Sequence, residues 1–252
     1  MRINTTANYK LIALDLDGTL LTDDKRISDE NKKWIRYATD HGVTVIFSTG
    51  RGIQTAGSIW KELELDSPMV LLNGAEIWEG PNKLFKRTFL SRDIVRRLYE
   101  IASSRGDWYW GYSVESLTGN DEWTSEMFER DWMKFGIGSH HAETLAQIRE
   151  ELLRWGTIEV TASAHTNMEI TAKDISKKSG VSEVCKLLGI TMSDVIAVGD
   201  NDNDSKLLQA AGLGVAMANA VDHVKSIADV VTAPNNEDGI AAAIRKYVFQ
   251  LD

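Results

Sequence analysis

Short runs of apolar residues alternate along the chain with segments whose apolar positions recur at helical spacing. Uninterrupted apolar runs predict buried strands at residues 9–15, 43–50 and 69–75, with helices between them at 28–42 and 51–65. The last quarter repeats this pattern, with helices at 179–188, 203–210, 222–228 and 237–248 and strands at 194–200, 213–217 and 229–231. Strands that alternate with helices predict an α/β fold, a Rossmann-like core whose parallel sheet is covered on both faces.

Residues 84–172 follow a different pattern, which predicts an inserted α+β domain. A helix beginning at Ser91, an irregular stretch and a helix over 139–155 precede two alternating strands at 158–164 and 167–171. The predicted core then consists of residues 1–83 and 173–252. Five of the eight tryptophans lie in the insertion: Trp108, Trp110, Trp123, Trp132 and Trp155. Such rings either fill the core of a small domain, which is the commoner use, or stack on a ligand.

Composition narrows the functional classes. The 28 basic and 37 acidic residues give a net charge of −9, which argues against a general nucleic-acid binder. The single cysteine, Cys185, excludes an internal disulfide, fits a reducing cytoplasm and is predicted to fill the core. No apolar run is long enough for a signal peptide or a membrane span, so we expect a cytoplasmic monomer or small homo-oligomer without a membrane partner.

Polar residues follow the predicted strands at the point where each strand ends. They are Asp15 and Asp17 after the first strand, Thr49, Gly50 and Arg51 after the second, Asn73 after the third, and Asp200, Asp202, Asn203 and Asp204 after the strand at 194–200. The carboxyl ends of parallel strands form one rim, where ligands bind. Neighbouring carboxylates repel unless one is protonated or a cation lies between them. Carboxylates in this number predict a hard cation such as Mg²⁺.

Each motif alone has a simpler explanation. "DGT" is also a turn sequence, and "GDNDND" is also a capped helix start. A calcium loop is excluded, because Ser205 replaces the required glycine and Ala211 the closing glutamate. All motifs fall at successive predicted strand ends, which favours one shared site over unrelated turns.

These motifs resemble those of the haloacid-dehalogenase-like (HAD) phosphatases, specifically the Cof-type branch with a type-IIB cap. "DLDGTL", "STGR" and "GDNDND" match the first, second and fourth family motifs, and "NGAEI", "GVAMANA" and "NNEDGIAAAI" resemble recurring segments of the branch. Ala218 stands where glycine is usual. Too few residues separate Asp15 from Thr49 to hold a cap. The insertion lies between Thr49 and Lys177, which resembles the second cap type.

The third family motif contains a lysine, and two residues of this chain could supply it. Family members commonly read Ser-Lys-Gly or Ser-Lys-Ala and then a helix that ends in Leu-Gly-Ile. Counting back from Leu188 to the expected position of the lysine favours Lys177. Lys178 fits a solvated lysine.

The resemblance implies Mg²⁺-dependent hydrolysis of a small phosphomonoester. A sugar phosphate is favoured, and nucleotides, glycolytic acids and a vitamin precursor such as a flavin intermediate stay open. The resemblance makes Asp15 the nucleophile, which forms an aspartyl-phosphate, and Asp17 the acid and then the base. Thr49 and Lys177 would bind the phosphoryl oxygens. The metal would be held by Asp15, Asp200 and the backbone carbonyl of Asp17, with Asp204 ordering its waters and Lys177. The weaker candidates for phosphate or substrate contact are Gly50, Arg51, Asn73 and Asn203.

Two alternatives stay open at this point. One is phosphoryl transfer to an acceptor other than water, as in phosphomutases of the same superfamily. The other is a non-catalytic binding module, which would not require both Asp15 and Asp17. The cap is expected to set specificity, so that substitution of Trp110, Trp123 or Arg130 should reorder substrate preference.

Overall fold

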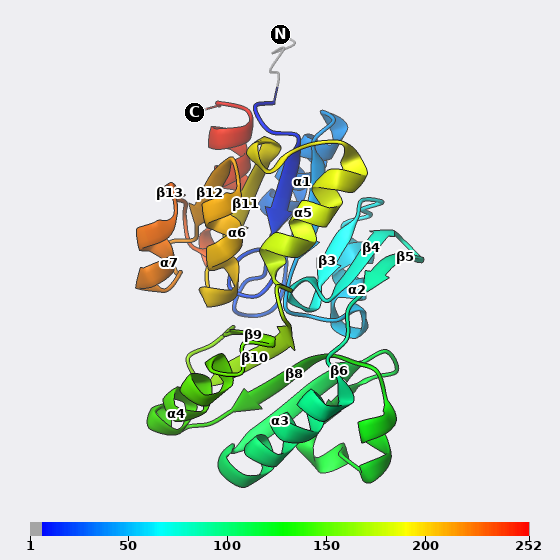
Figure 1. The fold of residues 1–252 in the computed structure, drawn as a ribbon. Helices are drawn as coiled ribbons and strands as arrows, with labels where there is room; N and C mark the ends of the chain where they lie inside the picture. The colour runs from blue at the N-terminus through cyan, green and yellow to red at the C-terminus, as the bar shows by residue number, and fades with distance from the viewer. Residues whose placement is uncertain (1–6, 252) are drawn as a thin grey trace.

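The computed structural model describes residues 7–251, which form two stacked domains (Figure 1). The upper domain contains an eight-stranded sheet in the order β13-β12-β11-β1-β2-β3-β4-β5. Its strands are β1 (Leu11–Leu14), β2 (Thr44–Ser48), β3 (Met69–Leu71), β4 (Glu76–Gly80), β5 (Lys83–Arg87), β11 (Val195–Gly199), β12 (Leu213–Ala216) and β13 (Val230–Val231). From β13 to β3 the neighbours pair in parallel, which confirms the predicted α/β core.

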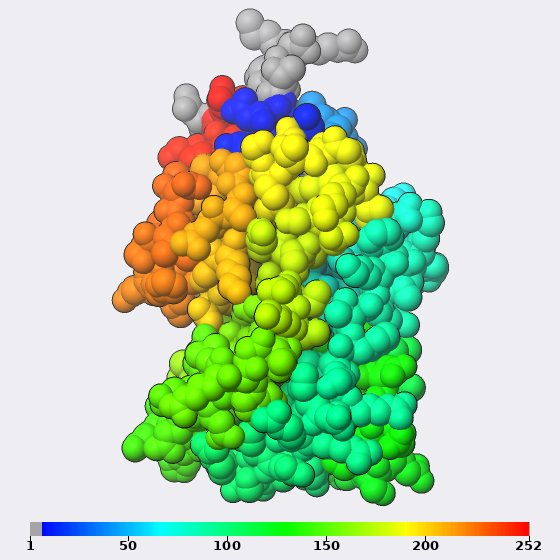
Figure 2. Space-filling model, viewed as in Figure 1, coloured from blue at the N-terminus to red at the C-terminus, as the bar shows by residue number. Residues whose placement is uncertain are grey.

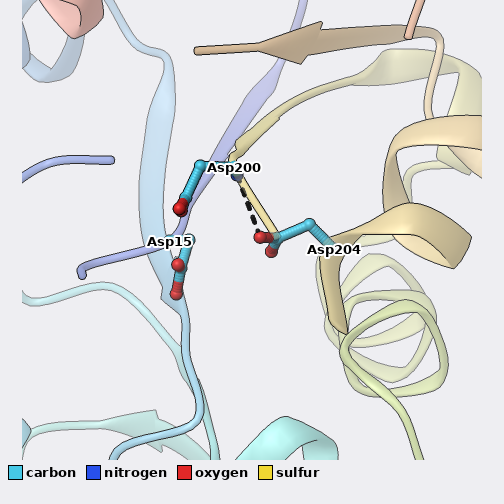
Figure 3. Close-up of side chains that lie close together, drawn as sticks. All are labelled: Asp15, Asp200 and Asp204. Carbon is cyan, nitrogen blue, oxygen red and sulfur yellow. Dashed lines mark hydrogen bonds between the residues drawn. The ribbon is translucent and has the colours of Figure 1, made fainter. Parts of the chain in front are cut away.

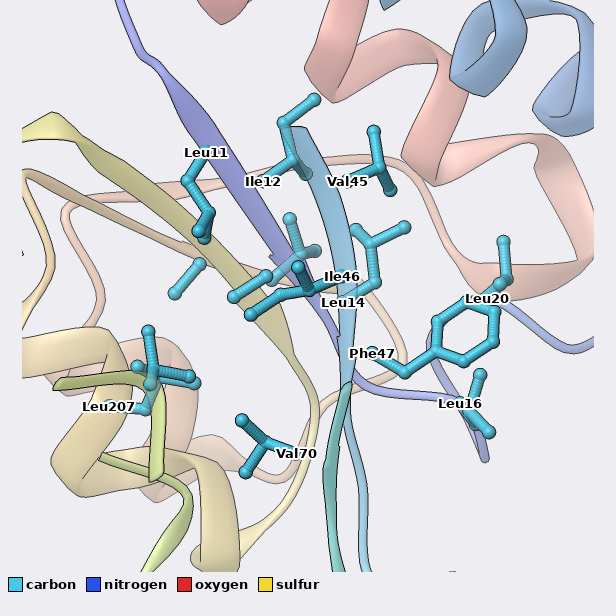
Figure 4. Packing of buried hydrophobic residues seen from close by; sticks show 14 of the residues in the cluster. Leu11, Ile12, Leu14, Leu16, Leu20, Val45, Ile46, Phe47, Val70 and Leu207 are labelled. Atoms are coloured by element: carbon cyan, nitrogen blue, oxygen red, sulfur yellow. The ribbon is translucent and has the colours of Figure 1, made fainter. Parts of the chain in front are cut away.

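Helices cover both faces of this sheet (Figure 1). They are α1 (Asp29–Asp40), α2 (Ile53–Glu62), α5 (Lys177–Leu188), α6 (Ser205–Ala210), α7 (Asp222–Ile227) and α8 (Gly239–Ala243), which continues as a π-helical turn (Ile244–Val248). Burial on both faces explains why the strands are apolar throughout: all four residues of β1 are buried (Figure 4). Cys185 is buried in the same core, as predicted.

The sheet is not parallel at every position, because β4 and β5 form an antiparallel hairpin after β3. These two strands are not predicted from the sequence. The side chains of β5 are mostly exposed, so the strand lacks the apolar pattern that marks the others. Residue 84, where the insertion was expected to begin, lies within β5.

The lower domain is an antiparallel sheet in the order β7-β6-β8-β10-β9. It comprises β6 (Trp108–Ser113), β7 (Leu117–Gly119), β8 (Trp132–Gly138), β9 (Ile158–Thr161) and β10 (Asn167–Ala172), with α3 (Arg92–Arg105) and α4 (Ala142–Leu153). The stretch expected to be irregular therefore contains three strands. Aromatic residues in alternate positions of "WYWGYS" are typical of a strand.

Helices α3 and α4 pack on one face of the cap sheet, away from the upper domain (Figure 1). The other face of the sheet is turned toward the carboxyl ends of β1, β2 and β11. Tyr112 and Met133 of the cap join the apolar cluster of the upper domain, and Figure 2 shows the two domains in contact along a continuous seam. Within residues 7–251, no helix combines the length and apolarity needed to cross a membrane.

Candidate active site

Three carboxylates converge at the carboxyl ends of two neighbouring strands (Figure 3). Asp15 follows β1 and Asp200 follows β11, and these strands pair in register. Asp204 ends the short 3₁₀ turn Asp202–Asp204. Side-chain oxygens of Asp15, Asp200 and Asp204 all lie within 4.8 Å of one another. Asp204 is fixed by the backbone N–H groups of Asp200 and Asn201, each of which donates to its Oδ2 over 3.1 Å.

Lys177 is the counter-charge inside this cluster. It occupies the first position of α5, and its Nζ lies 2.8 Å from Oδ1 of Asp15 and 2.6 Å from Oδ1 of Asp204. Burial lowers its pKa, but the two carboxylates outweigh burial and the net direction is upward. Lys177 is therefore charged, whereas Lys178 points into solvent. Of the two lysines considered from the sequence, only Lys177 reaches the site.

One lysine does not neutralise three carboxylates. Burial raises the pKa of Asp15 well above its ordinary value, and Asp204 and Asp200 raise it further against the opposing effect of Lys177. Burial, followed by repulsion from Asp204, raises the pKa of Asp200 to about 6. A cluster of oxygen ligands with excess negative charge suits a hard divalent cation. The residues present therefore fit the predicted Mg²⁺.

The turn after β1 is shaped around Asp200. Gly18 has φ +76°, and a Cβ at this position would overlap the carboxylate of Asp200. The next residue, Thr19, donates from Oγ1 to Oδ1 of Asp200 over 2.9 Å. The "DGT" sequence is thus a turn, as the simpler explanation held, and the turn also orients a carboxylate of the cluster.

Asp17 lies at the same rim but is not part of the cluster of three carboxylates. Arg51 donates from Nε and Nη2 to its two oxygens over 2.6 and 2.7 Å, and Lys25 donates over 2.7 Å. Burial alone would raise the pKa of Asp17; the hydrogen bonds from Arg51 and Lys25 outweigh it and lower the pKa to about 2. Asp17 is ionised in this arrangement. Asp17 and Arg51 are both predicted from the sequence, but their pairing and the contact from Lys25 are not.

The loop after β2 contributes a hydroxyl and backbone groups. Thr49 is buried, and its N–H donates to the carbonyl of Val70 in β3 over 3.0 Å. Asn73, after β3, has a left-handed backbone with φ 55° and is also buried. Its N–H donates to the carbonyl of Thr49 over 3.0 Å. Successive strand ends therefore hold one another in place.

The cap supplies a buried ion pair that the sequence analysis missed. Nζ of Lys134, on β8, lies 2.6 Å from Oε1 of Glu169, on β10, and donates to the carbonyl of Gly50 over 2.6 Å. Asn73 donates to Oε2 of Glu169 over 2.7 Å and accepts from Nδ2 of Asn203 over 3.3 Å. The signal available in the sequence was the single charged residue within each strand. This chain of polar groups crosses from cap to core.

A cavity of about 280 Å³ lies between the cap and the strand ends. It is lined by Asp15, Asp17, Lys25, Thr49, Gly50, Arg51, Trp110, Tyr112, Lys134, Ser163, Glu169, Asn201 and Asn203. A larger groove of about 1340 Å³ lies beside α1 and the start of β2, at the opposite ends of the strands. That groove contains none of the residues above, so the smaller cavity is the site.

One residue expected at the rim, and two cap residues expected to influence substrate preference, do not line the cavity. Asp202 pairs with Arg149 of α4 over 3.2 Å and does not join the other carboxylates. Trp123 stacks on Trp132 within the cap core, at 4.5 Å between ring centroids. Arg130 donates to Oγ of Ser116 over 3.1 Å and does not line the cavity.

Known proteins share both the sequence and the fold. A family profile described as haloacid dehalogenase-like hydrolase matches residues 12–136 and 119–244. The 5-amino-6-(5-phospho-D-ribitylamino)uracil phosphatase YcsE of Bacillus subtilis is 40% identical over 96% of this chain and 97% of its own length. A haloacid dehalogenase-like hydrolase structure from B. subtilis superposes with a TM-score of 0.87 at 28% identity, covering 93% of this chain and 98% of that one.

A further solved structure shares the fold, cap included. The HAD subclass IIB sugar phosphatase BT4131 superposes with a TM-score of 0.83 at 22% identity, covering 94% of this chain and 98% of that one. Its similarity extends over both domains. The chain belongs to the haloacid dehalogenase-like hydrolase family, in its Cof-type branch with a type-IIB cap, and is a phosphoric monoester hydrolase.

Proposed function

We propose that the protein hydrolyses a small phosphomonoester through an aspartyl-phosphate, with Mg²⁺ as cofactor. One observation carries the proposal. Asp15 lines the cavity while its carboxylate contacts Lys177 and lies beside Asp200 and Asp204. A buried nucleophile with a lysine on one side and spare carboxylates on the other suits attack on a phosphoryl group.

In the first step, an oxygen of Asp15 attacks phosphorus, and the bond from phosphorus to the leaving oxygen breaks. Thr49 and Lys177 hold the phosphoryl oxygens, on which charge is spread in the transition state. Asp17 donates a proton to the leaving alkoxide. Because Asp17 is ionised beside Arg51 and Lys25, this role requires it to leave them and become protonated when substrate binds.

In the second step, water attacks the phosphorus of the aspartyl-phosphate, and the bond to Asp15 breaks. Asp17 takes the proton from that water, which needs the ionised form. Inorganic phosphate leaves and Asp15 is regenerated. Mg²⁺, held by Asp15, Asp200 and the Asp17 carbonyl with Asp204 beside it, would neutralise the charge between the carboxylate and the phosphate.

A phosphorylated sugar or polyol is the favoured substrate class. Most residues that line the cavity are charged or can form hydrogen bonds with the hydroxyl groups of a sugar or polyol. Its apolar surface comes mainly from two aromatic rings. The relative YcsE is named for a substrate with a phosphoribityl chain, which belongs to this class. We therefore include 5-amino-6-(5-phosphoribitylamino)uracil among the candidate substrates. The alternative is transfer to a sugar-phosphate acceptor, which would make phosphate release slow until that acceptor is added.

The two domains have different roles in this proposal. We propose that the cap begins after β5 and ends with β10, so that the chain on both sides supplies the nucleophile, the metal ligands and Lys177. The acidic chain with its buried Cys185 supports a cytoplasmic enzyme that acts without nucleic acid or a membrane.

Phosphate release from a panel of phosphomonoesters tests the function directly. With Mg²⁺, purified protein should hydrolyse several sugar and polyol phosphates, and EDTA should lower the rate on the order of 10²-fold or more. Restoring Mg²⁺ should restore the rate. If no member of the panel released phosphate with Mg²⁺ present, the proposal would be wrong.

The two neighbouring lysines provide a matched pair of variants. Lys177→Met should lower kcat by about 10²–10³-fold, because it removes a donor to the transferring phosphoryl group. Lys178→Met makes the same chemical change on an exposed residue and should stay within about twofold of the wild type. The reverse result would assign the phosphate contact to Lys178.

A further inference from the structure

The register of the cap strands shows which side chains project from the face of the cap sheet that meets the core. Residues directly opposite each other in antiparallel strands project from the same face. Trp110 on β6 is opposite Gly136 on β8, which in turn is opposite Glu169 on β10. Tyr112 is opposite Lys134 in the next row. Two aromatic rings and one ion pair therefore lie side by side above the catalytic rim.

The ring of Trp110 lies flat against the sheet. A Cβ added to Gly136 would overlap the indole, so the ring covers the backbone of this glycine. One indole face contacts the sheet, and the other is turned away from it. Trp110 is only partly buried and lines the cavity together with Asp15 and Thr49. Trp108 covers Gly138 in the same way but does not line the cavity.

A polar group in the same cavity lacks a partner. Oδ1 of Asn203 is buried and accepts no hydrogen bond from any of residues 7–251, although Asn203 is 6% exposed. A buried acceptor left unpaired is unfavourable, so a ligand donor is favoured there. Trp110 thus offers a flat apolar surface and Asn203 an unpaired acceptor, and both residues line the cavity.

We propose that Trp110 stacks on a flat, single-ring nitrogen heterocycle carried by the leaving group. The heterocycle is joined to the phosphate by a polyol or sugar chain, and its N–H or the chain's O–H donates to Asn203. The cavity volume of about 280 Å³ is small for a ligand site and favours one ring over a fused ring system. This inference rests on the proposed function and names the substrate class within it.

Substrates matched except for the ring provide the test. Wild-type kcat/KM for 5-amino-6-(5-phosphoribitylamino)uracil should exceed that for ribitol 5-phosphate by about tenfold or more, the effect expected for one ring stacked on an aromatic side chain. Trp110→Ala should reduce this ratio to about two or less, through the ring-bearing substrate alone. Trp110→Phe should keep most of the ratio, because it keeps an aromatic face.

Trp108→Ala is the matched control, since it uncovers a glycine on the same sheet outside the cavity; it should leave the ratio unchanged. Binding gives a second readout: calorimetry on Asp15→Asn should show about tenfold weaker binding of the ring-bearing substrate once Trp110→Ala is added. An equal loss on both substrates with Trp110→Ala would make Trp110 structural and overturn the inference. If the enzyme hydrolysed phosphomonoesters without preferring the ring-bearing substrate, only the inference about Trp110 would be wrong. If it hydrolysed no phosphomonoester, the proposed function would be wrong as well.

Discussion

Asp15→Asn is expected to lower kcat on the order of 10⁴-fold or more, because an amide cannot replace the attacking carboxylate. The variant should nevertheless fold. Asp15 is one of three buried carboxylates that share one lysine, so removing its charge relieves repulsion. Phosphate release from the best substrate, together with the melting temperature, measures both effects.

Asp202→Asn is the control for this substitution. It makes the same chemical change nearby, on a residue that pairs with Arg149 instead of joining the cluster, and it should keep near-normal turnover. Asp17→Asn should slow both steps and allow phosphoenzyme to accumulate with a good leaving group. Near-wild-type activity in Asp15→Asn would rule out the covalent route.

Lys134→Met is expected to have the largest effect on stability. It leaves Glu169 buried and without its cation, which costs about 3–5 kcal/mol in the free energy of unfolding. Adding Glu169→Gln removes the unpaired buried charge. The double variant should therefore recover a large part of the lost free energy of unfolding. Chemical denaturation of the two single variants and the double variant measures this, with Lys178→Met as an exposed control. Additive losses would show that the two side chains do not stabilise each other.

The same pair implies a pH dependence of stability. Burial raises the pKa of Glu169, but Lys134 and Asn73 outweigh it and hold the pKa below its ordinary value. Because the folded-state pKa is lowered, this stabilisation is present above the unfolded-state pKa of about 4.3 and is lost as the pH falls through the lower folded value. Lys134→Met should therefore reduce the acid sensitivity that arises from Glu169.

The rim of the site was predictable because each residue follows its own strand. Asp15 and Asp200 end apolar runs, and the geometry of a parallel sheet brings such ends together without knowledge of distant contacts. Asp202 was placed wrongly because the 3₁₀ turn directs neighbouring aspartates to different sides, and a turn of this kind leaves no periodic signal.

The cap contacts could not be predicted by the same reasoning. Lys134 and Glu169 meet only because β8 and β10 are neighbours in one particular register, which neither strand reveals alone. The orientation of Trp110 depends in the same way on the register of β6 and β8. Trp110 and Trp123 looked equivalent in the sequence, yet one lines the cavity and the other packs against α3 with Tyr99 and Phe128.

The pairing of β1 with β11 also determines when this enzyme can acquire its active site during synthesis. Leu11 pairs with Val195, so the strand that bears the nucleophile lacks one neighbour until most of the chain has left the ribosome. The cap strands β6, β7 and β8 follow one another closely and can pair earlier, since contacts between nearby residues form fastest. Until β11 arrives, β1 is an exposed apolar edge, the kind of edge that associates with other chains. Nascent chains that end before Val195 should therefore aggregate more readily than chains in which β11 has paired with β1.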